Sequence, residues 1–206
     1  MFDTEQENFW AGRFGDEYIT RNLDKNELAA RLYMFANILN SRGQINGILE
    51  FGPNIGLNLK ALRLLLPKAE LCAVEINEKA ARACAAIEGV KVFNESLLDF
   101  RTEERYDLTF TSGVLIHINP GKLSMAYETL YRHSRRYILM MEYYNPTPVE
   151  VIYRGHEGKL FKRDFPGEFM KKYPDVHLVD YGCTYHGDNN FYLDDFNWFL
   201  MEKSNN

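Results

Sequence analysis

The sequence has few cysteines and no paired cysteine motif. Only three of its 206 residues are cysteine, Cys72, Cys84 and Cys183, and none lies at the short spacing of a zinc or redox motif. An odd number of cysteines does not suit a disulfide framework. We therefore expect free thiols in a reducing compartment. No HExxH sequence or Cys/His cluster predicts a metal site.

Long apolar runs and an excess of positive charge are also missing. No run approaches the ~18 apolar residues that a membrane-spanning helix needs, and residues 1–5 show no basic or apolar signal segment. The 24 basic and 29 acidic residues give a net charge of −5, which does not favour nucleic acid as the main partner. We expect a cytoplasmic protein with no membrane partner. At about 150 residues per domain, residues 1–206 form a single domain.

Strand-like and helix-like patterns alternate through the middle of the chain. Short apolar runs predict strands at 48–51, 71–75, 90–93, 108–111 and 137–141, and helices at 57–66, 78–87 and 121–133. This alternation predicts an α/β protein with a parallel sheet and helices on both faces.

The two ends of the chain and one insertion depart from this alternation. Residues 1–43 read as a helical segment that could act as a lid, and residues 44–142 form the alternating core. Residues 143–163 predict an irregular insertion that overhangs the sheet edge where ligands bind. The apolar pattern of residues 164–206 predicts a helix at 164–173 and two strands at 176–185 and 196–202. These two strands should pair antiparallel, because only a loop joins them.

The sharpest local motif follows the first predicted strand. Glu50 is the next-to-last residue of that strand, and Gly52 and Gly56 lie in the turn before the next helix. Such a turn lies at the carboxyl edge of an open α/β sheet, where ligands bind. Glu75, at the end of the second strand, is suited to accept hydrogen bonds from a ribose diol. Together these residues predict an adenosine-containing ligand.

The glycine spacing distinguishes between two adenosine-containing ligands, a dinucleotide and a ligand that carries a methionine moiety. A dinucleotide fingerprint is GxGxxG, whereas here Asn54 and Leu57 occupy the second and third glycine positions. Glu50 would repel a diphosphate, but it suits a cationic ligand such as the amino group of a methionine moiety.

The pattern Glu50-x-Gly52-x-x-x-Gly56 resembles motif I of the class I S-adenosylmethionine (SAM)-dependent methyltransferases. The similarity extends over residues 48–142, and the two last strands fit the same family. It implies a Rossmann-like seven-stranded sheet, mostly parallel with an antiparallel last strand, and SAM as the cofactor. Ser96 to Asp99 match the segment that lines the adenine, and Tyr106 to Ile118 match motif IV, beside the methyl group. Asn54 departs from the family, in which a glycine is common at that position.

A narrower resemblance covers nearly the whole chain. It rests on residues 9–18, 114–120, 142–148 and 153–156, which are similar to the methylases associated with pseudaminic acid biosynthesis. That clade is linked to bacterial nonulosonic sugars, so the resemblance implies a sugar hydroxyl, free or nucleotide-linked, as the methyl acceptor.

These arguments give a set of candidate site residues. For the cofactor the set is Trp10, Tyr18, Arg21, Glu50, Gly52, Asn54, Gly56, Glu75, Ile76, Ser96, Leu97 and Gly113. For a polar, anionic acceptor it is Tyr143, Tyr144, Asn145, Arg154, His156 and Arg163. His117 is the first candidate for the base that takes the acceptor's proton, and His156 is the second.

Other functions remain open at this point. The acceptor could be another small amine or carboxylic acid, or the protein could bind an adenosyl ligand without catalysis. The missing GxGxxG disfavours a nicotinamide-dependent oxidoreductase. The predicted strand 108–111 runs into Ser112-Gly113-Val114, without the Asp/Asn-Pro-Pro-aromatic motif that an adenine methylase places after that strand. The oligomeric state is left open.

Overall fold

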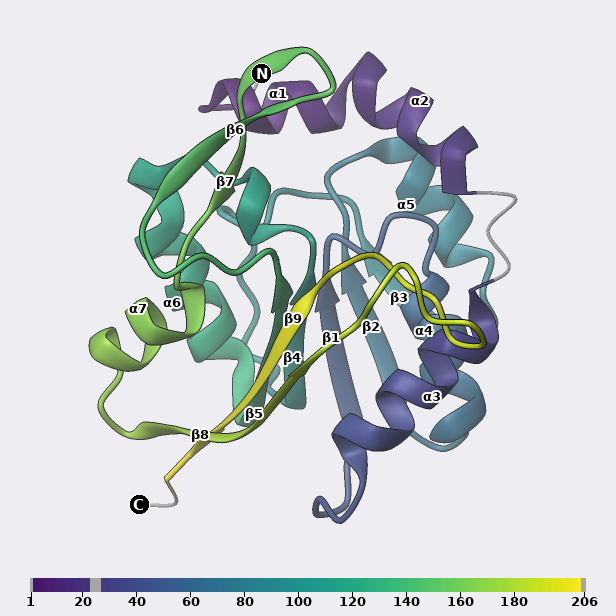
Figure 1. Ribbon diagram of the computed structural model, residues 1–206. Coiled ribbons are helices and arrows are strands. Elements are labelled where there is room, and N and C mark those ends of the chain that lie inside the picture. The colour runs from purple at the N-terminus through teal and green to yellow at the C-terminus, as the bar shows by residue number, and fades with distance from the viewer. Residues whose placement is uncertain (1, 23–26, 205–206) are drawn as a thin grey trace.

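A seven-stranded sheet forms the centre of the computed structural model, which describes residues 2–22 and 27–204 (Figure 1). The strands are β1 (Gly47–Phe51), β2 (Glu70–Val74), β3 (Val90–Phe93), β4 (Tyr106–Ser112), β5 (Ser134–Glu142), β8 (Val176–Cys183) and β9 (Asn197–Lys203). Their order is β3-β2-β1-β4-β5-β9-β8. β1 to β5 pair in parallel, and β9 pairs antiparallel with both β5 and β8. The predicted fold class is confirmed, including the antiparallel last strand.

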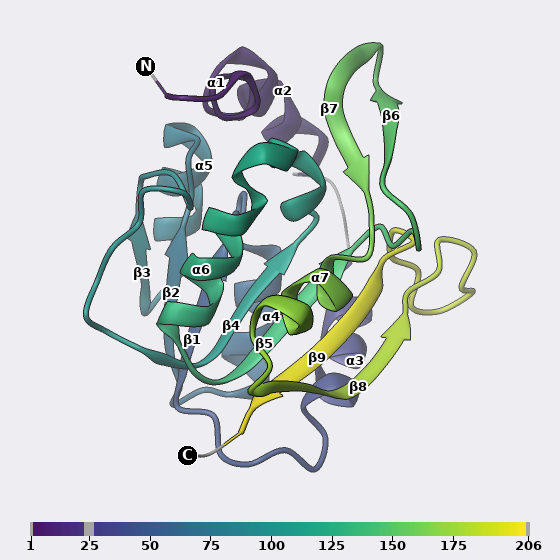
Figure 2. The ribbon, with the colours of Figure 1, turned by 90° about the vertical axis from the view of Figure 1, so that its left-hand side faces the viewer.

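Helices cover both faces of the sheet (Figure 2). The helices are α1 (Glu5–Ala11), α2 (Arg13–Asn22), α3 (Leu28–Leu39), α4 (Leu57–Leu65), α5 (Glu78–Ala85), α6 (Leu123–His133) and α7 (Phe165–Lys172), with short 3₁₀ turns η1 (Leu115–His117) and η2 (Pro120–Lys122). α3, α4 and α5 pack on one face. α6, α7 and the segment after β3 pack on the other face.

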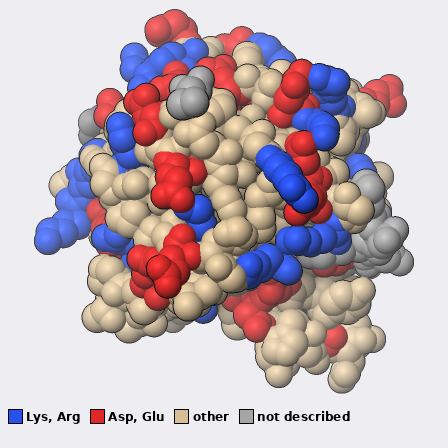
Figure 3. Space-filling model, turned by 90° about the horizontal axis from the view of Figure 1, so that it is seen from above, with Lys and Arg blue, Asp and Glu red and all other residues tan. Residues whose placement is uncertain are grey.

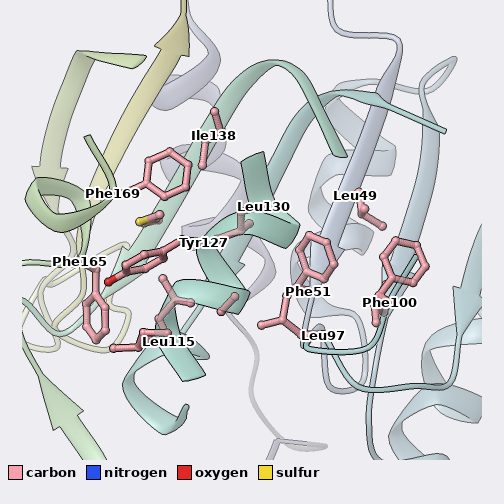
Figure 4. Packing of buried hydrophobic residues seen from close by; sticks show 14 of the residues in the cluster. Leu49, Phe51, Leu97, Phe100, Leu115, Tyr127, Leu130, Ile138, Phe165 and Phe169 are labelled. Carbon is pink, nitrogen blue, oxygen red and sulfur yellow. The ribbon is translucent and has the colours of Figure 1, made fainter. Parts of the chain in front are cut away.

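The core follows from the alternation of side chains along the buried strands. Leu49 and Phe51 of β1 lie in the cluster on the α6 side, whereas Ile48 between them lies in the cluster on the α3 side. Figure 4 shows Phe51 beside Phe100 and Leu97, with Tyr127 and Phe169 further along the same layer. Both clusters are apolar, so burial of the two sheet faces drives the folding of this core.

The insertion after β5 is a β-hairpin, which corrects the predicted irregular segment. β6 (Val149–Tyr153) pairs antiparallel with β7 (His156–Lys162) and stands above the main sheet (Figure 1). Arg154 and Gly155 form the turn with φ of 51° and 83°, the positive values that a two-residue hairpin turn requires. β6 is exposed on both faces, so its sequence lacks the alternation that marks a half-buried strand.

The helical segment expected at the N-terminus is present as α1 and α2, which lie above the sheet (Figure 1), and α3, which packs on one of its faces. Thr4 begins α1 with a capping box, in which Thr4 and Glu7 exchange hydrogen bonds. Asn77, at the start of α5, donates to Asp16 of α2 at 3.0 Å. Gln6 donates to the Gly158 carbonyl oxygen of β7 at 2.9 Å. The ring centroid of Phe14 in α2 lies 5.6 Å from that of His156 in β7. α1, α2 and the β6–β7 hairpin thus form one layer, called the cap below, and Asn77 ties this layer to the core.

The outer face of the cap carries charges of both signs. Viewed from above, acidic and basic side chains are interspersed rather than gathered by sign (Figure 3). Within α2, Arg13 pairs with Glu17 at 2.7 Å, and Asp16 of the same helix pairs with Lys79 of α5 at 2.6 Å. Across residues 2–22 and 27–204, no helix is long and apolar enough to cross a membrane.

Candidate active site

A cavity of about 300 Å³ lies between the carboxyl ends of the central strands and the cap. Its walls come from the loops after β1, β2, β3 and β4, from α3, and from all three parts of the cap. The predicted site residues that line it are Trp10, Tyr18, Arg21, Glu50, Gly52, Asn54, Glu75, Ile76, Ser96, Leu97, Gly113, His117, Tyr143 and Arg154.

Glu50 is a fully buried carboxylate in the cavity wall. Its Oε1 accepts a hydrogen bond from Asn58 Nδ2 at 2.7 Å, whereas its Oε2 is buried and has no partner. Burial is the main reason that the pKa of Glu50 rises from 4.5 to about 8. A buried oxygen without a donor is costly. A cation with N–H groups would pair this oxygen and stabilise the ionised form.

Arg31 and Asn58 extend this polar wall toward α3. Arg31 donates to Asn58 Oδ1 and pairs with Glu27 Oε2 at 2.6 Å. Its Nε is buried without a partner. Trp10 Nε1, in the roof of the cavity, is also buried and unpartnered. Glu50, Arg31 and Trp10 thus line the same cavity, and each has a buried oxygen or N–H group without a hydrogen-bond partner.

Glu75 joins the end of β2 to the loop after β1. Its Oε2 accepts from the Asn54 N–H at 2.8 Å and its Oε1 accepts from the Asn77 N–H at 2.9 Å. Burial raises the pKa of this carboxyl group and the backbone hydrogen bonds partly oppose that rise. Each carboxylate oxygen has a second lone pair, so Glu75 can hold the loop and still accept hydrogen bonds from a ligand.

The glycines of the loop after β1 have different roles. Gly52 has φ +68°, and a Cβ there would lie 2.5 Å from Val114 Cγ2, so this glycine lets the segment after β4 approach. Gly56 has φ +77°, but it is not among the residues that line the cavity. A Cβ at Gly56 would lie 2.4 Å from Ile87 Cδ1. Gly56 therefore permits close packing at the start of α4, and no ligand contact follows from its position.

His117 lies at the end of η1 and faces the cavity. Its Nδ1 is 2.5 Å from the Lys159 carbonyl oxygen of β7, so this nitrogen carries the proton and Nε2 has the lone pair. Burial lowers the pKa of His117 to about 4, so the ring is neutral at pH 7. Its ring centroid lies 4.6 Å from that of Trp10 and 4.9 Å from that of Tyr153.

Glu142, at the end of β5, orients the turn that holds His117. It is buried and accepts hydrogen bonds from the N–H groups of Val114, Leu115 and Ile116 at 3.1 to 3.3 Å. Burial raises the pKa of Glu142 to about 7. Sequence reasoning did not identify this residue.

The segment expected at the acceptor side divides into two sets. Tyr143 and Arg154 line the cavity, and the Tyr143 hydroxyl donates to Asp194 Oδ2 at 2.8 Å. The structure does not bring four other candidates to the cavity, namely Tyr144, Asn145, His156 and Arg163. Each has a contact elsewhere: with Phe199, Thr147, Phe9 and Glu168, respectively. Tyr153, Asp194 and Phe196 line the cavity without having been predicted.

Two further residues of the cavity wall, Glu7 and Ser96, meet between the cap and the core. Glu7 of α1 is buried, and its Oε1 accepts from Ser96 Oγ at 2.5 Å. Thr4-x-x-Glu7 fits the capping-box pattern, a signal that could have identified this carboxylate from the sequence. No group of three His, Cys, Asp or Glu side chains suited to a metal ion is found in the part of the chain that the structure describes.

Sequence comparisons with known proteins give no match. No family model matches the chain, and no curated protein matches it.

Solved structures do match, over almost the whole chain. The plantazolicin methyltransferase BpumL, in complex with a monoazolic desmethylPZN analogue and S-adenosylhomocysteine (SAH), is 15% identical with a TM-score of 0.67, over 97% of this chain and 94% of that one. The N-methyltransferase NodS from Bradyrhizobium japonicum WM9, in complex with SAH, is 12% identical with a TM-score of 0.66, over 92% and 98%.

A third match comes from Burkholderia thailandensis. The 1,6-didemethyltoxoflavin-N1-methyltransferase of that organism, with bound 1,6-didemethyltoxoflavin and SAH, is 13% identical with a TM-score of 0.68, over 97% and 87%. At such identities the likeness concerns the fold. The chain therefore has the Rossmann-like fold of methyltransferases that have been solved with SAH bound.

Proposed function

We propose that the protein is a SAM-dependent methyltransferase. The observation that carries the proposal is Glu50, a fully buried carboxylate whose Oε2 has no partner in the wall of the main cavity. The α-amino group of the methionine moiety is a cation with three N–H donors, and it would pair this oxygen. The fold supports the same ligand, because all three compared structures contain SAH.

The cavity walls suggest how SAM is oriented. Glu50 holds the amino group and Glu75 holds the ribose hydroxyls. Arg31, with its unpartnered Nε beside Asn58, holds the carboxylate. Arg21, a cofactor candidate from the sequence, also lines the cavity, where its guanidinium lies over the Phe14 ring of the cap at 5.4 Å. The adenine lies against Ser96 and Leu97. This orientation directs the methyl group toward Gly113 and His117.

The reaction proposed is an in-line methyl transfer to an acceptor hydroxyl. The acceptor oxygen forms a bond to the methyl carbon while the C–S bond breaks, and the electron pair of that bond remains on sulfur as a neutral thioether. The hydroxyl proton passes to Nε2 of His117. The neutral ring is available for this role because the Lys159 carbonyl oxygen fixes the proton on Nδ1.

The acceptor is proposed to be a small acidic sugar, of the nonulosonic type that the sequence resemblance implies. Arg154 supplies a cation at the cavity wall, and Tyr143 and Tyr153 supply hydroxyl groups there. An arginine suits a carboxylate or phosphate, and hydroxyls suit a polyol. The cap closes over this region, so a small molecule fits better than a polymer.

Transfer of a labelled methyl group tests the proposal. With methyl-labelled SAM and a panel of acidic sugars, amino sugars and nucleotide-linked sugars, we expect a product methylated on oxygen. His117→Gln should lower kcat by about 10²–10⁴-fold. His177→Gln, an exposed histidine on β8, is the matched control and should leave kcat unchanged.

Two results would contradict the proposal. A product methylated on nitrogen would reject the hydroxyl acceptor. Binding of SAM without turnover on any acceptor in the panel would favour a protein that binds the cofactor without catalysis.

A further inference from the structure

We infer that Glu7, on the N-terminal helix α1, recognises the 6-amino group of the cofactor's adenine. The inference rests on the proposed function, because it assumes that SAM binds in the main cavity. It assigns a residue of the cap, rather than of the sheet loops, as the one that distinguishes adenine from other purines.

The first observation is the position of Glu7. This residue is 6% exposed, lines the cavity and contacts Ser96, which begins the segment matched to the adenine site. Ser96, Leu97 and Leu98 all line the cavity. Asp99, the acid of the same segment, is exposed and does not line it. Glu7 is therefore the carboxylate that lies against this part of the wall.

The second observation is the unused hydrogen-bonding capacity of Glu7. Oε2 accepts from both the Thr4 N–H, at 3.0 Å, and the Thr4 hydroxyl, at 2.8 Å. Oε1 accepts only from Ser96 Oγ, at 2.5 Å. A carboxylate oxygen has two lone pairs, so Oε1 can accept one more hydrogen bond. An exocyclic amine donates N–H, whereas the 6-oxo group of a hypoxanthine cannot.

The surrounding contacts hold the carboxylate in place. The Leu98 N–H donates to Ser96 Oγ at 3.1 Å, which directs the Ser96 hydroxyl proton toward Glu7. The Thr4 capping box fixes the other oxygen. Glu7 is thus oriented before a ligand binds, and such preorganisation favours discrimination between ligands.

Analogues of SAH provide the test without an acceptor. The affinities of the wild-type protein and of Glu7→Gln are measured by calorimetry for SAH and for the analogue with hydrogen in place of the 6-amino group. In the wild type, we expect loss of the amino group to weaken binding by about 10- to 100-fold, the range for a hydrogen bond to a charged group. In Glu7→Gln, replacing the 6-amino group of the ligand with hydrogen should weaken binding by less than about 3-fold.

A third ligand tests the direction of the effect. In Glu7→Gln the amide oxygen stays on the Thr4 N–H, so the amide NH₂ takes the place of Oε1. The 6-oxo analogue of SAH should then bind more tightly to Glu7→Gln than to the wild type. The control is Glu17→Gln, the same change at an exposed residue of α2, which should leave all affinities unchanged.

Each outcome has a separate meaning. Equal losses in the wild type and in Glu7→Gln on removal of the amino group would overturn the assignment of Glu7. Absence of SAH binding to the wild type would instead overturn the proposed function. If Glu7→Gln does not fold, the wild-type complex with SAH decides the matter. The inference expects Glu7 Oε1 within about 3.2 Å of the adenine amino nitrogen, and a separation too long for a hydrogen bond overturns it.

Discussion

At the scale of single residues, the two carboxylates at the strand ends could be located from the sequence. A buried acid at the end of β1 and another at the end of β2 must meet at the same sheet edge, because the two strands are parallel. The hydrogen bonds of these acids could not be predicted, since they depend on how the loops close. Glu75 holds the Asn54 N–H, and Glu50 is left with one oxygen unpaired.

Other residue-scale features escaped prediction for identifiable reasons. Arg31 lies within an apolar helix pattern, where an arginine reads as part of the exposed face. Successive residues of an extended chain point in opposite directions, which explains why Tyr143 lines the cavity and Tyr144 does not. The sequence shows that Gly56 permits a close approach, but not that the approaching group is Ile87 rather than a ligand.

A prediction at this scale concerns proton release on binding. Because the pKa of Glu50 is about 8 in the free protein, its carboxyl group is protonated at pH 7. Pairing with the ligand's ammonium group requires the ionised form, so binding of SAH at pH 7 should release nearly one proton. Calorimetry in two buffers of different ionisation enthalpy measures this number. Equal release in the wild type and in Glu50→Gln would contradict the assigned role of Glu50.

At the scale of the elements, the strands and helices of the alternating core were predicted with ends at most about three residues away from those observed, whereas the hairpin of the cap was not predicted. The core strands are apolar and short, and the turns after β1 and β4 carry glycine. β6 is exposed along most of its length, and the Arg-Gly turn of the β6–β7 hairpin is not among the strong hairpin signals. The antiparallel pairing of the last two strands followed from the loop that joins them, whereas their order in the sheet did not.

A pair of glycine variants tests the different roles in the loop after β1. In both variants the new Cβ is attached to a residue with positive φ and lies too close to a neighbouring side chain. Each variant should therefore destabilise the protein by about 1–3 kcal/mol. Gly52→Ala pushes on Val114 at the cavity wall and should also weaken SAH binding. Gly56→Ala pushes on Ile87 and should leave SAH affinity unchanged in the protein that remains folded. Thermal melting and calorimetry separate the two effects, and an equal loss of affinity in both variants would be evidence against this division.

At the scale of the whole molecule, the site is maintained at a cost in stability. The pKa values of Glu50 and Glu142 are raised from 4.5 to about 8 and about 7, respectively. Between pH 4.5 and these raised pKa values, each of the two groups holds its proton in the folded protein but has lost it in the unfolded chain. Stability must then fall as pH rises through this window. His117 acts in the opposite direction, because its pKa is lowered from 6.5 to about 4, but its contribution is nearly complete by about pH 7.5, where the histidine of the unfolded chain has also lost its proton.

The resulting prediction is a melting temperature that depends on pH. Between about pH 6.5 and 8, the two carboxylates should lower the stability of the unliganded protein by ~2 kcal/mol, which corresponds to about 4–8 °C in melting temperature. Glu50→Gln, which cannot ionise, should reduce the slope and be more stable than the wild type at pH 8. Thermal melting across this range checks the sign, and a wild-type melting temperature that rises with pH would contradict it.

The most direct measurement of the central claim is the affinity for SAH of four proteins: the wild type, Glu50→Gln, Glu75→Gln and Glu70→Gln. Glu70 lies at the opposite, exposed end of the strand that Glu75 follows, so it serves as the matched control. One SAH should bind per wild-type chain and per Glu70→Gln chain with equal affinity. Each of the other two variants should bind at least about tenfold more weakly, the loss of one hydrogen bond to a charged group. Equal affinity in all four proteins, or no binding to the wild type, would contradict the claim that these two buried carboxylates hold the cofactor.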